Sequence, residues 1–378
     1  MTSALADLRP LPADCFVGRI PVRNIWLLLF YASELFRIRG PAKVNLEERP
    51  DELPDLVGEL LAPAVEKRQR RGLSLGYRTR SASLNRVRGR IDVLTTERHQ
   101  LLERGLIHCK FDELTIDTTR KRYIRAALEV LSRLVQNSRL AHRCRSLAAS
   151  LKSLGVSGIV PTRAEISLDR FGRNDAQDQE MMAAAKLAFD LALPTEVAGT
   201  TAMPLPDREA QWVWRLFEKA VGGFYEVALS SSAWNVYRGT SLTWHIEQKT
   251  SGIDHILPNM RTDIILENAP RARRIIIDTK FTTMFHPGWY QDETLRSAHI
   301  YQIYAYLRSQ SGIGDPLADT ASGVLLHPAV GELIDENVTI QSHNIRFATV
   351  DLAATPQVFR SQLLRICEEL PSNIYEEK

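Results

Sequence analysis

Hydrophobic residues near the N-terminus follow the spacing of a buried helix. Six of them share one face: Ile25, Leu28, Leu29, Ala32, Leu35 and Phe36. The other side of the same helix is also apolar, at Trp26, Leu27, Phe30 and Tyr31. A helix that is apolar nearly all round has no face suited to water. We therefore expect it to lie in a core or in an interface.

The pattern then changes to short β-like runs. Between Gly72 and Cys109 these runs are broken by Gly and Ser, which predicts a small sheet. Amphipathic spacing predicts a long helix at 120–140, and another helix is predicted at 181–193 after the polar, turn-rich segment 172–180.

Proline and glycine residues follow this last helix and indicate a domain boundary near 195–207. We expect residues 1–200 to form a mixed α+β domain and residues 201–378 to form a second domain. In the second domain the expected order is α-β-β-β-α-β, which is an α+β or α/β fold class. The expected elements are a helix at 207–230, strands at 243–248, 260–267 and 274–281, a helix at 294–309, and strands at 323–327 and 345–350.

Length and composition agree with two globular domains. The chain has 378 residues, of which 44% are hydrophobic and 25% charged, and domains usually hold about 100–200 residues. The longest apolar run, Ile25 to Ala32, is far short of the roughly 20 residues that span a membrane. The N-terminus lacks the pattern of a secretory signal, and the scattered cysteines indicate neither disulfides nor zinc. We expect a cytoplasmic protein without a membrane partner.

Basic residues are unevenly distributed. The net charge is only +3, but 38 of the 48 basic residues are Arg, which suits bidentate phosphate contacts. The segment Lys67–Arg90 holds nine basic residues and no acidic one. Its Arg86, Arg88 and Arg90 are candidates for contacts with a partner protein or with DNA.

Candidate chemistry is concentrated at residues 260–281, which predict a β-hairpin. Ile275–Ile277 reads as a buried strand that is followed by Asp278-Thr279-Lys280. Side chains two apart on a strand share a face, so Asp278 and Lys280 should project together and Thr279 should point away. Asp263 is expected on the paired strand.

Two carboxylates and an ammonium group suit phosphodiester hydrolysis. Carboxylate oxygens hold Mg²⁺ against the phosphate, and a lysine orients water and offsets developing charge. The triplet alone is a weak signal, because about one or more is expected by chance in such a chain and this one has three. Only Asp278-Thr279-Lys280 combines a triple-Ile strand with an upstream aspartate. The competing interpretation is a surface salt bridge at a strand end.

Two helices offer further residues for the same site. Glu218 is a candidate third metal ligand, and an exposed helix charge is the alternative interpretation. His299, Gln302 and Tyr306 share a helix face, from which Gln302 could contact DNA or metal-bound water. A satisfied polar residue in the core is the alternative for Gln302.

These motifs resemble the McrC family, the nuclease subunit of McrBC-type 5-methylcytosine restriction systems. The resemblance covers most of the chain through IPVRNIWLLLFYASELF, LNRVRGRIDV, CKFDELTIDTTRKRYIRAAL, LFEKAV, LPNMRTDIIL, IIIDTKF and HIYQIYAYL. One departure is Thr262, which stands where the PD-(D/E)xK motif has Pro.

The resemblance implies a restriction-endonuclease-like PD-(D/E)xK domain with Asp263, Asp278, Lys280 and Gln302 as its catalytic residues. It implies Mg²⁺ as the cofactor, double-stranded and methylated DNA as the substrate, and a role in antiviral defence. It also implies a hexameric McrB-type AAA+ GTPase partner, which the N-terminal domain binds and stimulates. The chain has no GxxxxGK[ST] loop, so GTP is expected on the partner.

Two other functions stay open from the sequence. The chain could be a non-catalytic subunit that only activates the GTPase ring. It could also be a PD-(D/E)xK nuclease of DNA repair, which a helicase neighbour would favour.

Overall fold

The chain forms two compact units. The computed structural model describes residues 15–39, 50–73, 75–167, 176–197, 207–280, 285–286, 294–331 and 333–368. One unit comprises Pro54–Ala192, and the other combines the described residues of 15–53 with those from Leu193 onward. Within the described ranges, no helix has the length and apolar character that crossing a membrane requires.

This division differs in one respect from the expected domains. It falls after Ala192, close to the expected boundary at 195–207, of which 198–206 lie outside the described residues. Residues 15–39, however, belong to the second unit instead of the N-terminal domain. The cause is the helix that is apolar nearly all round, because its burial partners come from beyond residue 207.

The first unit contains a group of helices and a three-stranded antiparallel sheet with the order β3-β5-β4. Its helices are α3 (Leu53–Arg70), α4 (Val93–Arg98), α5 (Thr119–Leu134), α6 (Ser138–Ser153), α7 (Arg163–Ser167) and α8 (Ala176–Val197), with a 3-10 turn, η4, at Leu101–Arg104. Its strands are β3 (Gly76–Leu84), β4 (Arg90–Ile91) and β5 (Ile107–Thr115).

The single helix expected at 120–140 is wrong, because the chain turns between α5 and α6. The Asn137 side chain accepts hydrogen bonds from Arg139 N at 3.0 Å and from Leu140 N at 3.2 Å, and so caps a new helix. Asp55 of α3 accepts from the backbone N–H groups of Gln136 and Asn137 and holds the turn. Residues 172–175, the first part of the polar segment 172–180, lie outside the described residues.

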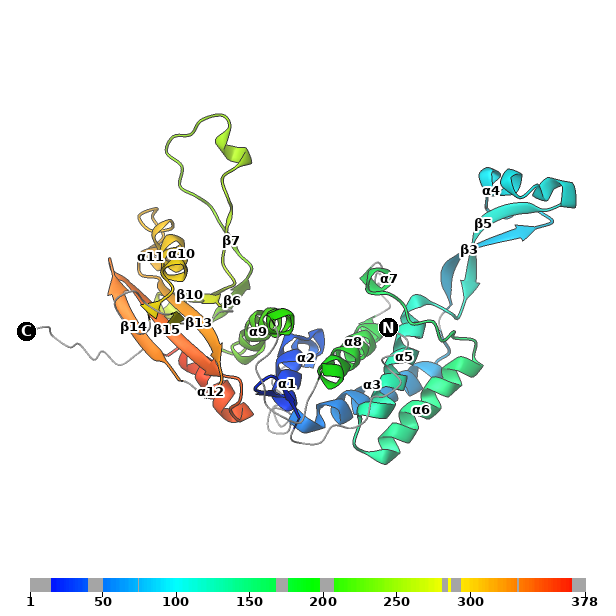
Figure 1. The fold of residues 1–378 in the computed structure, drawn as a ribbon, viewed down its shortest axis with the longest axis horizontal. Coiled ribbons are helices and arrows are strands. Elements are labelled where there is room, and N and C mark those ends of the chain that lie inside the picture. The colour runs from blue at the N-terminus through cyan, green and yellow to red at the C-terminus, as the bar shows by residue number, and fades with distance from the viewer. Residues whose placement is uncertain are drawn as a thin grey trace, which may run out of the picture. The chain divides into compact units, whose positions relative to one another are not determined.

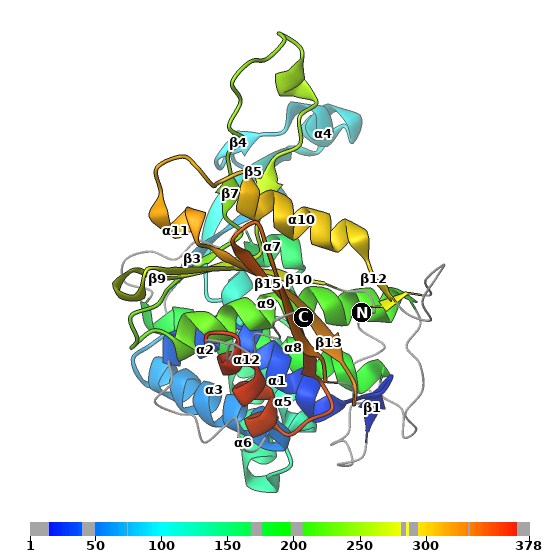
Figure 2. The same ribbon diagram turned by 90° about the vertical axis from the view of Figure 1, so that its left-hand side faces the viewer.

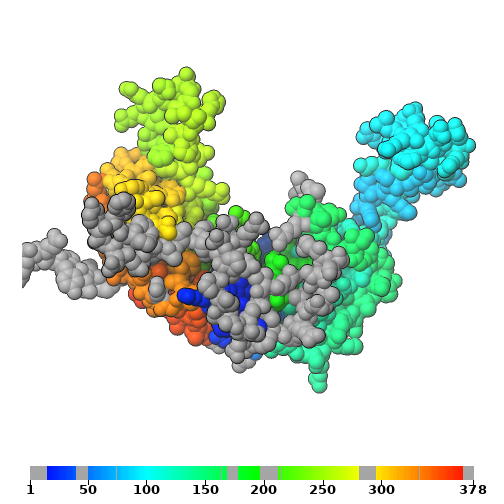
Figure 3. Space-filling model, in the orientation of Figure 1, coloured from blue at the N-terminus to red at the C-terminus, as the bar shows by residue number. Residues whose placement is uncertain are grey.

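Residues 76–115, which we call the arm, extend away from the helices of their unit. β3 pairs with β5 along its whole length, and α4 lies at the far end (Figure 1). Most of β3 is exposed, and the space-filling view shows the arm standing clear of the helices (Figure 3). Only β5 is covered in part, by α4 and η4, and the exposed surface that remains is suited to contacts with another molecule.

The second unit is built on a six-stranded mixed sheet with the order β14-β15-β13-β10-β9-β6. Its strands are β6 (Asn235–Arg238), β9 (Ile264–Asn268), β10 (Arg273–Thr279), β13 (Ser322–Ala329), β14 (Asp335–Ile340) and β15 (His343–Asp351). The pairs β10–β13 and β13–β15 are parallel, and the other pairs are antiparallel.

Helices and short ribbons complete this unit. The helices are α1 (Val22–Ala32), α2 (Glu34–Arg39), α9 (Asp207–Ala228), α10 (Ser297–Arg308), α11 (Pro316–Asp319) and α12 (Pro356–Arg365), with 3-10 turns η3 (Pro50–Glu52), η5 (Ile253–His255) and η6 (Ala269–Arg271). Three two-stranded ribbons pair β1 (Phe16–Val17) with β2 (Ile20–Pro21), β7 (Ser241–Leu242) with β8 (Met260–Arg261), and β11 (Phe285–His286) with β12 (Thr294–Leu295). The expected α+β fold class is confirmed.

One face of the sheet is covered by α10, which lies across β10, β13 and β15 (Figure 2). Ile303 and Leu307 of this helix are fully buried in a cluster with Ile276 and Leu325 of the sheet. Gly323 permits the close approach, because a Cβ there would lie 2.6 Å from Ile303 Cγ1. This packing fixes the position of the α10 side chains relative to the ends of the strands.

The N-terminal segment packs against α9 and α12 of the same unit. A Cβ on Gly223 would lie 2.1 Å from the Tyr31 carbonyl oxygen, so α1 and α9 touch backbone to backbone. Tyr31 also packs edge-on against Phe224, with ring centroids 5.3 Å apart. Asn24 donates hydrogen bonds to the carbonyl oxygens of Leu352 and Ala354. These contacts account for the membership of residues 15–39 in the second unit.

The expected strand at 243–248 is wrong. Residues 243–250 have no regular structure, and the second partner of β9, on the side away from β10, is β6, which the sequence pattern did not indicate. The alternation of Leu242, Trp244 and Ile246 resembles a strand, but it has no ladder partner after the short β7–β8 pair. Trp244 instead donates its indole N–H to the Pro258 carbonyl oxygen at 2.7 Å.

Candidate functional site

The hairpin of β9 and β10 places Asp263 and Asp278 at the same end of the sheet. The last antiparallel pair joins Ile264 to Ile277, and next to it lie Asp278 of β10 and Asp263, which immediately precedes β9 and is not on the strand as expected. Buried isoleucines fill the preceding positions of both strands and leave little freedom for another register. The expected convergence of these two positions is therefore a consequence of the hairpin. Phe281, the last residue of the expected third strand, lies outside the described residues.

Asp263 is oriented by Thr279, contrary to the expectation that Thr279 points away from the site. The Asp263 Oδ2 atom accepts hydrogen bonds from the backbone N–H of Thr279 at 2.7 Å and from its hydroxyl at 2.8 Å. Asp263 precedes β9, outside the regular ladder, so its carboxylate reaches across to the neighbouring strand. The sequence contains no separate signal for this role of Thr279.

Asp278 is almost fully buried and forms an ion pair with Lys280. Burial raises the pKa of Asp278 to about 6, the Lys280 ammonium opposes this rise, and the charges of Asp263 and Glu218 add to it. Apart from the ion pair, its Oδ2 atom has no well-directed hydrogen-bond donor among the described residues. A buried, charged oxygen of this kind is suited to a cation.

Lys280 is held from the α10 side by a chain of hydrogen bonds. Its Nζ donates to Gln302 Oε1 at 2.7 Å, and Gln302 Nε2 donates to the Tyr306 hydroxyl at 2.6 Å. The Tyr306 hydroxyl in turn donates to the Arg261 carbonyl oxygen at 2.8 Å. We call Asp263, Asp278, Lys280 and Gln302 the strand-end site.

Glu218 of α9 lies within the electrostatic range of these carboxylates. It is half-buried, and burial together with the charge of Asp263 raises its pKa. Among the described residues, however, no three His, Cys, Asp or Glu side chains are close enough together to hold a metal ion. Asp263 and Asp278 supply carboxylate oxygens whose charges repel each other, and a hard divalent cation would relieve this repulsion; Glu218 lies within electrostatic range but does not complete a group of three ligands among the described side chains.

The basic segment 67–90 is partly neutralised in space by acids that are remote in sequence. Arg78 pairs with Asp117 at 2.8 Å, and Arg80 pairs with Glu113 of the neighbouring strand at 3.2 Å. Arg68 and Arg70 also form ion pairs. The segment is therefore less basic than its sequence indicates.

The other candidates of this segment lie in the arm. Arg86, Arg88 and Arg90 are exposed, and the Arg88 guanidinium lies 4.2 Å above the centre of the Phe111 ring. Exposed apolar side chains accompany them at Val87, Ile91, Val93, Leu94 and Leu102. Arginines mixed with exposed apolar side chains are typical of a protein-binding surface.

Comparisons with known proteins agree with the family resemblance. The family described as "McrBC 5-methylcytosine restriction system component" matches residues 14–201 and 211–317. The chain is 27% identical over 353 residues to the Escherichia coli (strain K12) "Type IV methyl-directed restriction enzyme EcoKMcrBC", which covers 93% of this chain and 98% of that protein.

Two solved assemblies from Thermococcus gammatolerans are also similar. One is a half-complex of McrB AAA+ hexamers with bound McrC, at 15% identity and a TM-score of 0.39, covering 83% of this chain and 68% of that one. The other is the McrBC complex, at 18% identity and a TM-score of 0.31, covering 57% and 59%. On the family match and the Escherichia coli relative, the chain belongs to the family of McrBC 5-methylcytosine restriction system components, as a protein of the McrC type.

Proposed function

We propose that the protein is the Mg²⁺-dependent DNA endonuclease subunit of a modification-dependent restriction system. The observation that carries this proposal is the buried Asp278–Lys280 pair, which Gln302 holds at the end of a central strand. A surface salt bridge, the competing interpretation, would have both partners in solvent, whereas the Asp278 side chain here is 3% exposed and that of Lys280 is 13% exposed. Family membership supplies the restriction system as the setting.

The residues of the strand-end site divide the work of phosphodiester hydrolysis. Bound Mg²⁺ on the oxygens of Asp263 and Asp278, with Glu218 as the candidate third ligand, would act as a Lewis acid on the scissile phosphate. Thr279 keeps the Asp263 carboxylate in one orientation through two hydrogen bonds. Lys280 supplies a fixed positive charge and N–H donors beside the reacting phosphate.

Gln302 and Tyr306 limit the motion of this ammonium group. The hydrogen-bond chain runs from Lys280 through both side chains to the backbone of Arg261, so the lysine is tied to two separate elements. Preorganised charge is more effective than a mobile lysine, because no reorganisation is needed during the reaction. In this proposal Gln302 acts beside the reacting atoms through its hydrogen bond with Lys280.

Replacement of Lys280 by Ala tests the catalytic role. The full chain is mixed with its McrB-type partner, GTP, Mg²⁺ and methylated DNA, and both cleavage and GTP hydrolysis are measured. We expect cleavage to fall by about 10³-fold or more, since a charge that stabilises the transition state is lost. GTP hydrolysis should persist. A matched control is Lys249→Ala, which removes an exposed lysine from the other internal acid-x-lysine triplet.

The outcomes separate the three candidate functions. Cleavage that survives Lys280→Ala would leave the chain as a non-catalytic activator of the GTPase. Cleavage of unmethylated DNA without GTP or partner would instead favour a repair nuclease. The restriction nuclease is supported if Lys280→Ala loses cleavage, Lys249→Ala keeps it, and cleavage by wild type requires the partner, GTP, Mg²⁺ and methylated DNA together.

For the arm we propose a contact with the McrB-type GTPase. Exposed Leu94, with 81% of its surface in solvent, and Val93 lie on α4 beside the arginines, and a DNA backbone offers no match for such apolar groups. The Asp92 side chain accepts a hydrogen bond from Thr95 N at 3.0 Å and caps α4, so these groups are presented by an ordered helix.

Substitutions in the arm distinguish a protein contact from a DNA contact. We expect Leu94→Ser and Arg88→Ala to reduce the stimulation of partner GTP hydrolysis by about tenfold, without a change in binding of the isolated chain to DNA. Leu154→Ser, which changes an exposed leucine outside the arm, is the matched control. Reduced DNA binding with normal GTPase stimulation would assign the arm to DNA.

A further inference from the structure

A cavity in the first unit lies apart from the strand-end site. It is lined by residues of α3, α5, α6, α8 and the start of β3, and its volume is about 320 Å³. This volume is near the lower end of the range for small-molecule sites. Apolar side chains form part of its wall, at Val65, Ile124, Leu151 and Met181. Leu75 and Tyr77 are largely exposed lining residues and mark its open side.

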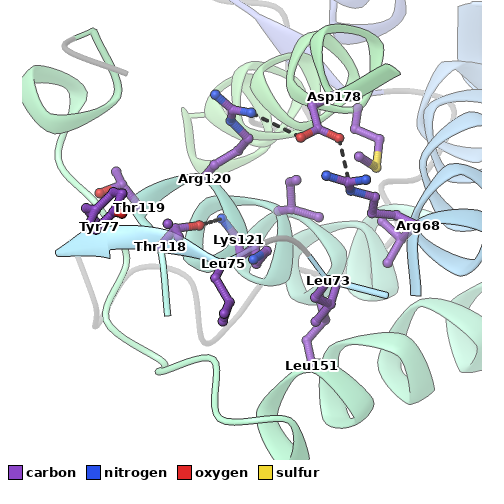
Figure 4. A pocket seen from close by; sticks show the side chains of 14 residues that line it. Arg68, Leu73, Leu75, Tyr77, Thr118, Thr119, Arg120, Lys121, Leu151 and Asp178 are labelled. Atoms are coloured by element: carbon purple, nitrogen blue, oxygen red, sulfur yellow. Dashed lines mark hydrogen bonds and ion pairs between the residues drawn. The ribbon is translucent and has the colours of Figure 1, made fainter. Parts of the chain in front are cut away.

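Two guanidinium groups flank one carboxylate at an end of this cavity. Arg68 Nε lies 3.4 Å from Asp178 Oδ1, and Arg120 Nη1 donates to Asp178 Oδ2 at 3.0 Å. Figure 4 shows the two arginines on either side of the Asp178 carboxylate. Asp178 is buried, so these ion pairs hold both guanidinium groups in defined positions.

Lys121 adds a third cation to the lining. It is buried, and its pKa is lowered to about 8, first because burial disfavours the ammonium charge and then because Arg68 is near, while Asp178 opposes the shift. An anion bound in the cavity would stabilise the Lys121 ammonium and raise its pKa, as the charge of Asp178 does.

The first turn of α5 contributes to the same lining. The Thr118 hydroxyl accepts a hydrogen bond from Lys121 N at 3.4 Å and caps the helix, which is 16 residues long. Thr118 and Thr119 both line the cavity together with Arg120 and Lys121, so the N-terminal turn of α5, with its partial positive charge, borders this volume. The helix end and the three cations therefore act on one volume.

We infer that this cavity binds a phosphate monoester of nucleotide size. The cations and the helix end hold the phosphate group, and the apolar wall holds the nucleoside. Among the described lining residues there are three cations and one carboxylate, which favours an anionic ligand. A cluster that served stability alone would need no adjoining volume, because protein interiors are close-packed.

Calorimetric titration of the full chain with GMP tests this inference, with guanosine and inorganic phosphate as parallel probes. We expect GMP to bind more tightly than either probe. Lys121→Gln should weaken GMP binding by about tenfold or more, since it removes a charge-assisted hydrogen bond. Leu75→Trp should also weaken it by blocking the open side, and this exposed position tolerates a larger side chain without unfolding.

Lys152→Gln changes an exposed lysine outside the lining and is the matched control, which should bind GMP as wild type does. Competition by a 5′-phosphorylated but not a 5′-hydroxyl oligonucleotide would identify a nucleic-acid end as the source of the phosphate, and absence of competition would identify a free nucleotide. The inference is overturned if guanosine binds as tightly as GMP. It is also overturned if neither Lys121→Gln nor Leu75→Trp changes the affinity for GMP.

Discussion

Burial of the Asp278 carboxylate makes the strand-end site a source of instability that one substitution should relieve. In Asp278→Asn the side chain keeps its shape but has no charge. In the folded wild-type protein the pKa of Asp278 is about 6, against an ordinary value of 3.8. Such a difference corresponds to about 3 kcal/mol between the two protonation states. The variant should therefore be the more stable protein at neutral pH, and under the proposed function it should also lose DNA cleavage.

The sign of the pH dependence follows from the raised pKa. Below about pH 3 the aspartate is mostly protonated in both the folded and the unfolded state, so charge gives the variant no advantage. As the pH rises towards 6, the unfolded state releases its proton first, and the wild-type fold loses stability. Above about pH 7 the carboxylate is charged in both states and the full difference of about 3 kcal/mol is reached.

Urea unfolding at pH 4.5 and pH 8, in a chelating buffer that removes divalent cations, measures this difference. The variant should unfold at a higher urea concentration than wild type at pH 8, and the gap should be smaller at pH 4.5. Asp254→Asn, which alters an exposed aspartate paired with Lys249, should shift the midpoint little at either pH. A variant that is less stable than wild type at pH 8, or a gap that does not depend on pH, would refute the reasoning.

Three further substitutions test the packing and positioning described above. Tyr306→Phe removes the hydroxyl that links Gln302 to the backbone of Arg261. The cleavage rate should fall by about tenfold to a hundredfold, while the melting temperature stays unchanged. A variant that cleaves as fast as wild type would contradict a positioning role for Tyr306. Thr279→Val leaves the Asp263 carboxylate with one hydrogen bond from residue 279 instead of two. We expect a several-fold rise in the Mg²⁺ concentration that gives half-maximal cleavage, measured by titration with Mg²⁺. An unchanged Mg²⁺ concentration would contradict the orienting role of Thr279. Gly223→Ala places a methyl group against the Tyr31 carbonyl oxygen and should lower the free energy of unfolding by about 3 kcal/mol. Gly252→Ala, where the added methyl group meets no neighbour, should change the free energy of unfolding by less than about 1 kcal/mol. Equal effects of the two variants in chemical denaturation would contradict the close contact of α1 with α9.

Several features of the second unit were predictable from local patterns. Three consecutive isoleucines have few alternatives to a buried central strand, and Ile275–Ile277 indeed form the middle of β10. Asp278 and Lys280 follow these isoleucines at the strand end, and they project on the same side because side chains two apart on a strand share a face. The helix around Trp26 was predicted to be buried for the same kind of reason, because it has no polar face, and its burial is confirmed.

Other features depend on partners that a linear pattern does not identify. Trp244 and Ile246 alternate as in a strand, but the neighbouring segment offers no ladder beyond β7–β8. The charge run 67–90 contains no acid, yet Arg78 and Arg80 meet carboxylates from β5 and its flanking turn. The role of Thr279 depends on the exact position of a carboxylate sixteen residues earlier. These are tertiary effects, and only the folded arrangement reveals them.

The membership of α1 in the second unit has a consequence for synthesis on the ribosome. This helix leaves the exit tunnel early, but the α9 surface that covers it is encoded from residue 207 onward. At about 5–20 residues per second, the nascent chain carries an uncovered apolar helix for roughly ten to forty seconds. During that interval we expect the helix to be a target for chaperones, and a product truncated at residue 200 to aggregate.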